Sequence, residues 1–101
     1  MIITIARNRL RPEHQAEYYA LAARMLELCK AMPGFVRRTA FETPDGERIG
    51  ITEFASEETH RAWQQHPEHQ LAIQLGRERF YSEFQIQVCS VVKDYDFQAV
   101  S

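Results

Sequence analysis

The order of strand-like and helix-like segments along the chain is the feature that most limits its fold. Residues 2–10, IITIARNRL, start with β-branched side chains and then alternate, a pattern typical of a strand. From Pro12 to residue 32 the apolar side chains recur every three or four residues, which predicts a helix. Residues 35–42 and 48–54 read as two strands of a hairpin, because the TPDGE between them has turn chemistry.

The second half of the chain repeats this arrangement. Ser56 can cap a helix that should end near Gln65, because the residue before a proline avoids the helical region. Pro67 then starts a helical run to about Tyr81, and residues 84–97, FQIQVCSVVKDYDF, give a fourth strand. The predicted order is β-α-β-β-α-β. This is the split βαβ, or ferredoxin-like, plan of the α+β class, with two helices on one face of a four-stranded antiparallel sheet.

That plan leaves the other face of the sheet without cover. Both polar and apolar side chains are expected there: Arg37, Arg38, Gln85, Gln87, Ile3, Ile5, Cys89 and Val91. A second copy packed sheet against sheet would bury the apolar ones. We therefore expect a homodimer in which the two sheets form an α/β barrel.

The gross properties fit a single domain over residues 1–101 and exclude some partners. Hydrophobic residues make up 45% and charged residues 26%, the balance of a soluble globular protein. A net charge of −2 without a basic field argues against nucleic acid. Cys29 and Cys89 lack metal-type or redox-type spacing and are expected to be small core residues in a reducing compartment. No segment approaches the ~18 apolar residues of a membrane span, so we expect a cytoplasmic protein without a membrane partner.

Two of the four histidines, His66 and His69, flank Pro67 in the stretch HPEH. They could bind a metal, but a catalytic zinc site usually needs a third protein ligand, and none stands at a suitable spacing. His14 and His60 are expected at solvent-facing helix starts. The alternative is that His66 caps the restarted helix, with Pro67 at its first position and His69 one turn in. We therefore expect no metal.

An apolar stripe on the restarted helix indicates a pocket. At about 100° per residue, the stripe contains His69, Ile73, Gly76 and Phe80, with Arg77 at its margin. It extends toward Trp63, and a polar residue that ends an apolar groove is typical of a binding pocket. A core histidine with a satisfied hydrogen bond and a core tryptophan explain the same pattern, so both interpretations stay open.

These residues also carry a family resemblance. The stretch FASEETHRAWQQHPEHQLAIQLGRERFYSEFQIQVCSVVKDY resembles the antibiotic biosynthesis monooxygenase family, in its small quinol-oxidising branch. The matching features are the helix of Trp63, the pairs Glu68–His69 and Gly76–Arg77, and the FY that leads into the last strand. Together with MIITIARNRL and the PGF after the first helix, the resemblance spans essentially the whole chain.

The resemblance implies a pocket between helices and sheet in each subunit of a dimeric barrel. In such proteins dioxygen attacks an electron-rich phenol or hydroquinone without flavin or metal, so the expected partners are a small aromatic substrate and dioxygen, with no cofactor. Asn8 and Trp63 match positions that frame the pocket in several relatives. His69 is the candidate base and Arg77 the candidate group for the anionic oxygen. The other expected substrate contacts are His66, Ile73, Phe80 and Tyr81.

Two other functions stay open. The haem-degrading branch shares the fold, and it carries its haem-ligating histidine ten residues after the tryptophan. Here that position is Ile73, so His69 would have to replace the ligand. The third possibility is a dimeric module that binds an aromatic metabolite without converting it, because a fold alone does not define a function.

Overall fold

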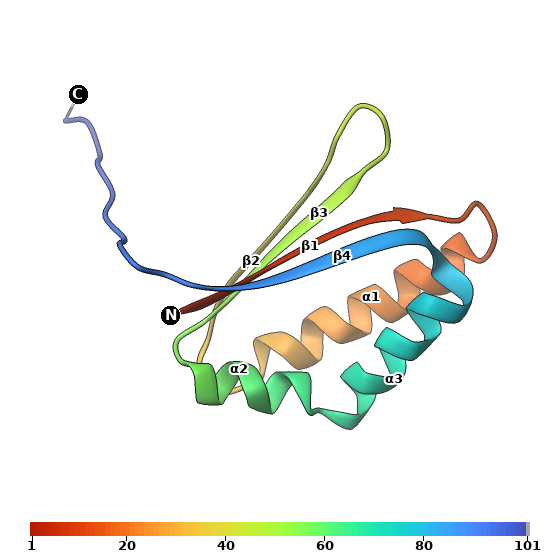
Figure 1. Ribbon diagram of the computed structural model, residues 1–101, viewed down its shortest axis with the longest axis horizontal. Coiled ribbons are helices and arrows are strands. Elements are labelled where there is room, and N and C mark those ends of the chain that lie inside the picture. The colour runs from red at the N-terminus through yellow and green to blue at the C-terminus, as the bar shows by residue number, and fades with distance from the viewer. Residues whose placement is uncertain (101) are drawn as a thin grey trace.

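The computed structural model describes residues 1–100 (Figure 1). Its elements are β1 (Ile2–Leu10), α1 (Gln15–Lys30), β2 (Phe35–Glu42), β3 (Arg48–Phe54), α2 (Glu57–Gln64), α3 (Pro67–Leu75), the π-helical turn η1 (Gly76–Phe80) and β4 (Tyr81–Ser90). The strands form one antiparallel sheet in the order β2-β3-β1-β4. The predicted ferredoxin-like architecture is confirmed. None of the helices within residues 1–100 is long and apolar enough to cross a membrane.

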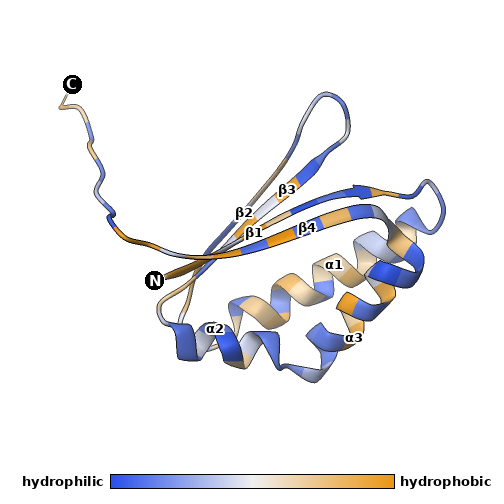
Figure 2. Cartoon of the chain, viewed as in Figure 1, coloured by the Kyte–Doolittle hydropathy of each residue, from blue (hydrophilic) through white to orange (hydrophobic). Residues whose placement is uncertain are grey.

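The helices cover one face of the sheet and leave the other bare (Figure 1). Because successive residues of a strand point to opposite faces, Thr4 and Ala6 face the helices whereas Ile3 and Ile5 lie on the uncovered face. Figure 2 shows apolar residues along α1, α3 and β4, and a largely polar α2. The buried core is a small cluster at the end of the sheet nearest α2: Cys29, Phe54 and Trp63, packed by Met25, Leu28, Met32 and Phe35.

Helix α1 begins later than the sequence predicts. The expected first residue is Pro12, whereas the helix starts at Gln15. His14 has a φ of 62°, in the left-handed region, and so cannot belong to the same right-handed helix. The chain from Pro12 to His14 therefore forms a turn that aims α1 back along the sheet.

Strand β4 is shifted toward the N-terminus relative to the predicted residues 84–97. It begins at Tyr81 and ends at Ser90. Ser90 pairs with Ile2, the first residue of β1, so the chain beyond Ser90 has no neighbouring strand with which to pair. Residues 91–100, which we call the C-terminal arm, run as an extended segment away from the domain (Figure 1).

Two predictions about side-chain placement were wrong. Arg37 and Arg38 were both expected on the uncovered face, but adjacent residues of a strand cannot share a face. Arg37 lies there and donates from Nε to Glu53 at 2.5 Å, whereas Arg38 faces the helices. Of the two cysteines expected in the core, Cys29 is buried and Cys89 is exposed, because β4 is an edge strand and Cys89 lies on its uncovered side.

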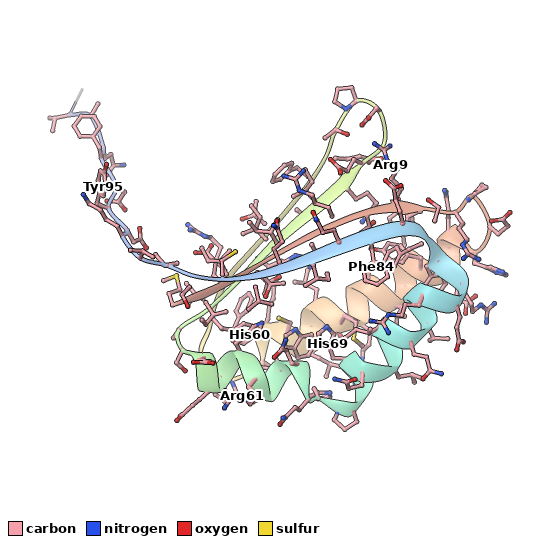
Figure 3. All side chains as sticks on the ribbon, viewed as in Figure 1. Arg9, His60, Arg61, His69, Phe84 and Tyr95 are labelled. Carbon is pink, nitrogen blue, oxygen red and sulfur yellow. The ribbon has the colours of Figure 1, made fainter. Side chains whose placement is uncertain are left out.

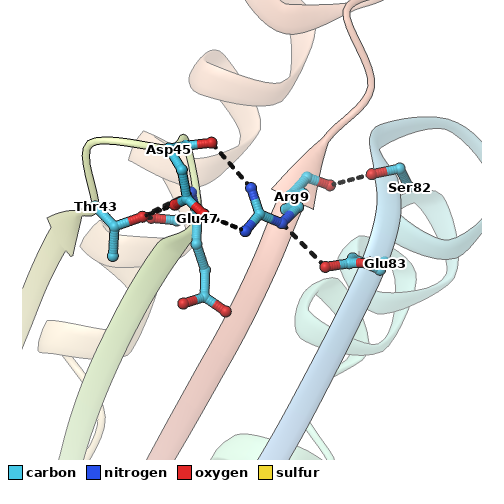
Figure 4. A network of polar contacts seen from close by, with 6 residues as sticks. All are labelled: Arg9, Thr43, Asp45, Glu47, Ser82 and Glu83. Atoms are coloured by element: carbon cyan, nitrogen blue, oxygen red, sulfur yellow. Dashed lines mark hydrogen bonds and ion pairs between the residues drawn. The ribbon is translucent and has the colours of Figure 1, made fainter.

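Arg9 ties the β2–β3 turn to the strands beside it (Figure 4). Its guanidinium contacts Asp45 Oδ2 at 2.9 Å and Glu83 Oε1 at 3.1 Å. The Thr43 hydroxyl also donates to the Asp45 carboxylate. These hydrogen bonds, from Thr43 first and then from Arg9, lower the pKa of Asp45 to about 2. The network fixes the turn against β1 and β4 at the end of the sheet remote from α2.

Candidate functional site

A cavity of about 370 Å³ lies between the helices and the covered face of the sheet. Its size falls in the range of small-molecule pockets, and most of its wall is apolar or aromatic. Half-exposed Phe84, Ile86 and Val88 line it along β4, so the cavity opens toward this edge strand. Figure 3 shows Phe84 and His69 in the space between sheet and helices.

Trp63 and His69 form a stacked pair in the cavity wall. Trp63 lies on α2 and His69 on α3, and their rings are 4.2 Å apart between centroids at an interplanar angle of 11°. His69 Nδ1 is 3.1 Å from the backbone oxygen of Trp63. A carbonyl oxygen only accepts, so in the neutral ring Nδ1 carries the hydrogen and Nε2 keeps its lone pair.

Burial keeps that imidazole neutral. It lowers the pKa of His69 against the opposing effect of the Trp63 carbonyl, and the neighbouring His66 and His60 lower it further. At neutral pH the ring is therefore uncharged, with Nε2 able to accept a proton. The ring stack and the hydrogen bond together fix the orientation of the His69 imidazole, as a general base requires.

His60 is a cavity residue that the sequence analysis placed wrongly at a solvent-facing helix start. It is buried, its Nε2 is 2.9 Å from Thr4 Oγ1, and burial lowers its pKa. His60 and Trp63 are three residues apart on α2 and therefore share its buried face. That spacing was the signal in the sequence that would have located His60.

Two of the expected site residues do not line the cavity. His66 is the N-cap of α3, where Nδ1 accepts from the Glu68 amide at 3.1 Å. Asn8 lies on the covered side of β1, paired with Arg48 of β3. The Oδ1 atom of Asn8 is buried and has no hydrogen-bond partner within residues 1–100. The structure thus leaves both residues out of the cavity wall, although the His66 ring lies beside Trp63, with 5.7 Å between the ring centroids.

The other expected residues line the cavity: Ile73, Arg77, Phe80 and Tyr81. The π-helical turn η1 carries Arg77, whose guanidinium carbon lies 5.6 Å from the centroid of the Phe84 ring. A π-turn inside a helix is often found at a functional site. Here it delivers one cation to an otherwise aromatic part of the wall.

Tyr81 is held as a neutral phenol at the same end of the cavity. Burial first, and then the neighbouring Tyr18, raise the pKa of Tyr81 above its ordinary value. Its ring packs so closely on Gly76 that a Cβ at that position would lie 2.6 Å from Tyr81 Cε2. Tyr81 can therefore donate a hydrogen bond but does not act as a base.

The family model described as antibiotic biosynthesis monooxygenase matches residues 1–75. This chain belongs to the antibiotic biosynthesis monooxygenase (ABM) family. The matched residues include β1, the buried residues His60 and Trp63 of α2, and all of α3 with His69.

Individual relatives of this ABM protein support the fold over most of its length. The uncharacterized protein YqjZ of Bacillus subtilis (strain 168) is 29% identical over 91 residues, which cover 90% of this chain and 80% of YqjZ. The structure of Rv0793 from Mycobacterium tuberculosis matches with a TM-score of 0.81 at 19% identity, over 94% of this chain and 98% of that one. SnoaB from Streptomyces nogalater, described as a cofactor-independent oxygenase, matches with a TM-score of 0.75 at 18% identity, over 92% and 94%.

Within residues 1–100 of this ABM protein, no group of three or more His, Cys, Asp or Glu side chains is placed to hold a metal ion. The polar groups that do meet the cavity come from separate elements: His60 from α2, His69 from α3, Arg77 from η1 and Tyr81 from β4. The arrangement is one that can accept a proton and bind an anionic oxygen inside an aromatic pocket.

Proposed function

We propose that this ABM protein is a cofactor-independent monooxygenase that oxidises a phenolic or hydroquinone-type aromatic with dioxygen. The observation that carries this proposal is the neutral His69, held by Trp63 with Nε2 available, in the wall of an aromatic cavity. Family membership and the likeness to SnoaB support the reaction class. The substrate class follows from the family resemblance, and the aromatic wall of the cavity suits it.

The proposed first step is removal of a phenolic proton by His69 Nε2. The substrate anion is electron-rich enough to react with dioxygen, so the protein has only to deprotonate it, orient it and stabilise its charge. Arg77 is suited to the anionic oxygen, because a guanidinium hydrogen-bonds strongly to charged oxygen. Trp63 provides an aromatic wall beside the substrate ring.

The oxygen and electron balance closes without a cofactor. A ring carbon of the anion forms a bond to dioxygen, and the resulting hydroperoxide loses water to leave a carbonyl at that carbon. One oxygen atom is retained in the product and the other leaves as water, with all electrons supplied by the substrate. The neutral phenol of Tyr81 and the protonated His69 are the groups available to return protons to the departing oxygen.

The proposal includes a homodimer. Half-buried isoleucines of β1 and β3 and exposed Phe41 of β2 share the uncovered face of the sheet: Ile3, Ile5, Ile49 and Ile51. The C-terminal arm adds Val92, Tyr95 and Phe97, which are 97%, 80% and 89% exposed. Exposed apolar side chains in this number are normally buried in an interface, and a second copy would provide one.

Oxygen uptake with a panel of hydroquinones tests the proposed reaction. Chelator-treated, cofactor-free protein should consume dioxygen in a protein-dependent way without accumulating hydrogen peroxide, which distinguishes monooxygenation from simple autoxidation. Tight binding of an aromatic without any oxygen uptake would instead support the binding-module alternative.

One observation favours haem degradation as a second candidate. A histidine whose Nδ1–H is fixed by a backbone carbonyl, as in His69, resembles a metal-ligating histidine oriented by its surroundings. The position ten residues after Trp63 is Ile73, which lines the cavity but cannot ligate iron. A haem titration followed by absorbance separates the two candidates, since only a haem site would give a stoichiometric shift of the haem spectrum that His69→Gln abolishes.

A further inference from the structure

Arg38 brings a positive charge into the cavity, and no carboxylate of the described residues 1–100 forms an ion pair with it. Other arginines of the chain form ion pairs: Arg9, Arg24, Arg37, Arg61 and Arg79. Arg38 makes neither an ion pair nor a side-chain hydrogen bond within residues 1–100, although it lines the cavity beside Thr4 and Thr52. The described cavity wall contains two arginines, Arg38 and Arg77, and no aspartate or glutamate.

Gly50 keeps the Arg38 guanidinium over the sheet. A Cβ built on Gly50 would lie 2.8 Å from Nη2, 3.3 Å from Nε and 3.4 Å from Cζ of Arg38. Gly50 does not have a positive φ, so the turn of the backbone does not require glycine here. Its strand neighbours are Ala6 and Ala40, which are also small. Three small residues side by side thus leave room for the guanidinium to lie across the sheet.

The charge of Arg38 reaches both walls of the cavity. It lowers the pKa of Cys29 on α1, against burial, which raises that pKa to about 11 overall. It also lowers the pKa of Tyr81 at the start of β4, again against the larger effect of burial. The guanidinium therefore lies at the floor of the cavity, where its charge acts on groups of both α1 and β4, while Arg38 itself remains exposed to solvent.

We propose that Arg38 binds a carboxylate group of the substrate, so that the preferred ligand is an aromatic acid with a phenolic or hydroquinone ring. A guanidinium presents two parallel N–H groups that match the two oxygens of a carboxylate. This inference rests on the proposed function, because it assigns the charge of the substrate of the same cavity. Arg77 remains available for the phenolate oxygen, so the two cations have separate partners.

The test compares two probes that differ only in the carboxylate, gentisate and hydroquinone. Binding is measured by calorimetry under anaerobic conditions, so that neither probe is oxidised. The wild-type protein should bind gentisate roughly ten-fold or more tightly than hydroquinone, as expected for one charge-assisted, two-point interaction. Arg38→Gln should bind gentisate only as tightly as it binds hydroquinone. Its affinity for hydroquinone should stay within about two-fold of the wild-type value.

Two further variants make the result specific. Gly50→Ala keeps the charge but forces the flexible guanidinium to move, so gentisate affinity should fall by an intermediate factor. Lys30→Gln removes the same charge from the exposed last residue of α1, outside the cavity wall, and should leave both affinities unchanged. Thermal melts confirm that each variant is folded.

Several results would overturn the carboxylate site: no gentisate binding at millimolar concentration, equal wild-type affinity for both probes, or a preference that survives in Arg38→Gln. Equal loss of both probes in a folded Arg38→Gln protein would also overturn it, because that indicates a structural role. Oxygen uptake recorded in parallel keeps the proposals apart. Selective gentisate binding without oxygen uptake supports the carboxylate site and contradicts the monooxygenase. Oxygen uptake with hydroquinone, without a preference for gentisate, supports the monooxygenase and contradicts the carboxylate site.

Discussion

His69 is the residue on which the proposed chemistry depends. Its orientation comes from two contacts with Trp63, the ring stack and the hydrogen bond to the backbone oxygen. Its neutrality comes from burial. The same burial that makes it a packing residue therefore makes it a base at neutral pH, and only a functional measurement distinguishes the two roles.

Replacing His69 with Gln should distinguish its role as a base from its role in packing. Glutamine keeps a hydrogen-bonding side chain but cannot titrate, so turnover should fall by ~10²–10⁴-fold, the usual cost of losing a general base. Thermal melts run beside the kinetics should show a folded protein. His14→Gln is the matched control, because His14 is exposed, precedes α1 and lies outside the cavity wall, so its loss should not slow the folded enzyme. Full turnover in folded His69→Gln would leave the substrate's own acidity as the source of the anion.

The two buried histidines also predict how stability depends on pH. Burial lowers the pKa of both His60 and His69, so as pH falls through ~6.5 the unfolded chain takes up protons before the folded chain does. Their contribution is complete above ~6.5 and is lost as pH falls through the lower folded-state pKa. Asp45, with a pKa of about 2, titrates well below this window.

Urea unfolding between neutral and mildly acidic pH measures this effect. The free energy of unfolding should decrease as pH falls below ~6.5, and the decrease should be smaller in His69→Gln. A decrease of the same size in wild type and His69→Gln would show that His69 does not resist protonation in the folded state.

The sequence locates site residues where local spacing carries the signal and misses them where the partner is distant. Trp63, His69, Ile73 and Arg77 follow from the helical stripe, and the structure places them in one cavity wall. Arg38 was assigned to the wrong face, because its position depends on the register of β2 against β3, including an irregularity between Phe35 and Arg37. No local pattern in the sequence reports that register.

At the scale of elements, the break between α2 and α3 shapes the site. Helix α2 ends before Pro67, and α3 restarts with His66 as its cap, which turns the chain so that His69 lies over Trp63. These caps were readable from the sequence, since each needs only a residue and its near neighbours. The end of β4 was not, because the apolar residues Val91 and Val92 follow Ser90 in the sequence, whereas β1, the strand with which β4 pairs, offers no partner beyond Ile2.

The cap of α2 gives a prediction about stability alone. The Ser56 hydroxyl oxygen accepts from the Thr59 amide, and the Ser56 amide donates in turn to Thr59 Oγ1. Ser56→Ala should lower the free energy of unfolding by about 1 kcal/mol. Ligand affinity of the folded protein should stay unchanged, because Ser56 lies outside the cavity wall. Urea unfolding and calorimetry check the two parts, and a loss of affinity would show that the cap also positions the Trp63–His69 pair.

At the scale of the whole molecule, the uncovered sheet face and the C-terminal arm both expose apolar side chains, and a homodimer would bury both. The arm forms a backbone hydrogen bond only at its start, from the Val91 amide to the Met1 oxygen. Val92, Tyr95 and Phe97 beyond it are almost fully exposed. Burying a large apolar side chain contributes ~1.5–3 kcal/mol, so an arm packed on a second copy would add substantially to a dimer.

Deleting residues 91–101 should therefore weaken the dimer and leave the protomer folded. Sedimentation velocity should show a wild-type dimer at micromolar concentration and a shift toward monomer in the shortened chain. Circular dichroism controls for the fold. A wild-type monomer at that concentration would contradict the dimer, and an unchanged dimer after the deletion would assign the interface to the sheet face alone.

The most direct test of the account is turnover of a hydroquinone by metal-free, cofactor-free protein under isotopically labelled dioxygen, with mass spectrometry of the product and of the water formed. The account predicts one labelled oxygen atom in each product molecule, the second label in water, and loss of both in His69→Gln. Oxidised product without label, formed together with hydrogen peroxide, would contradict it, because dioxygen would then act only as an electron acceptor.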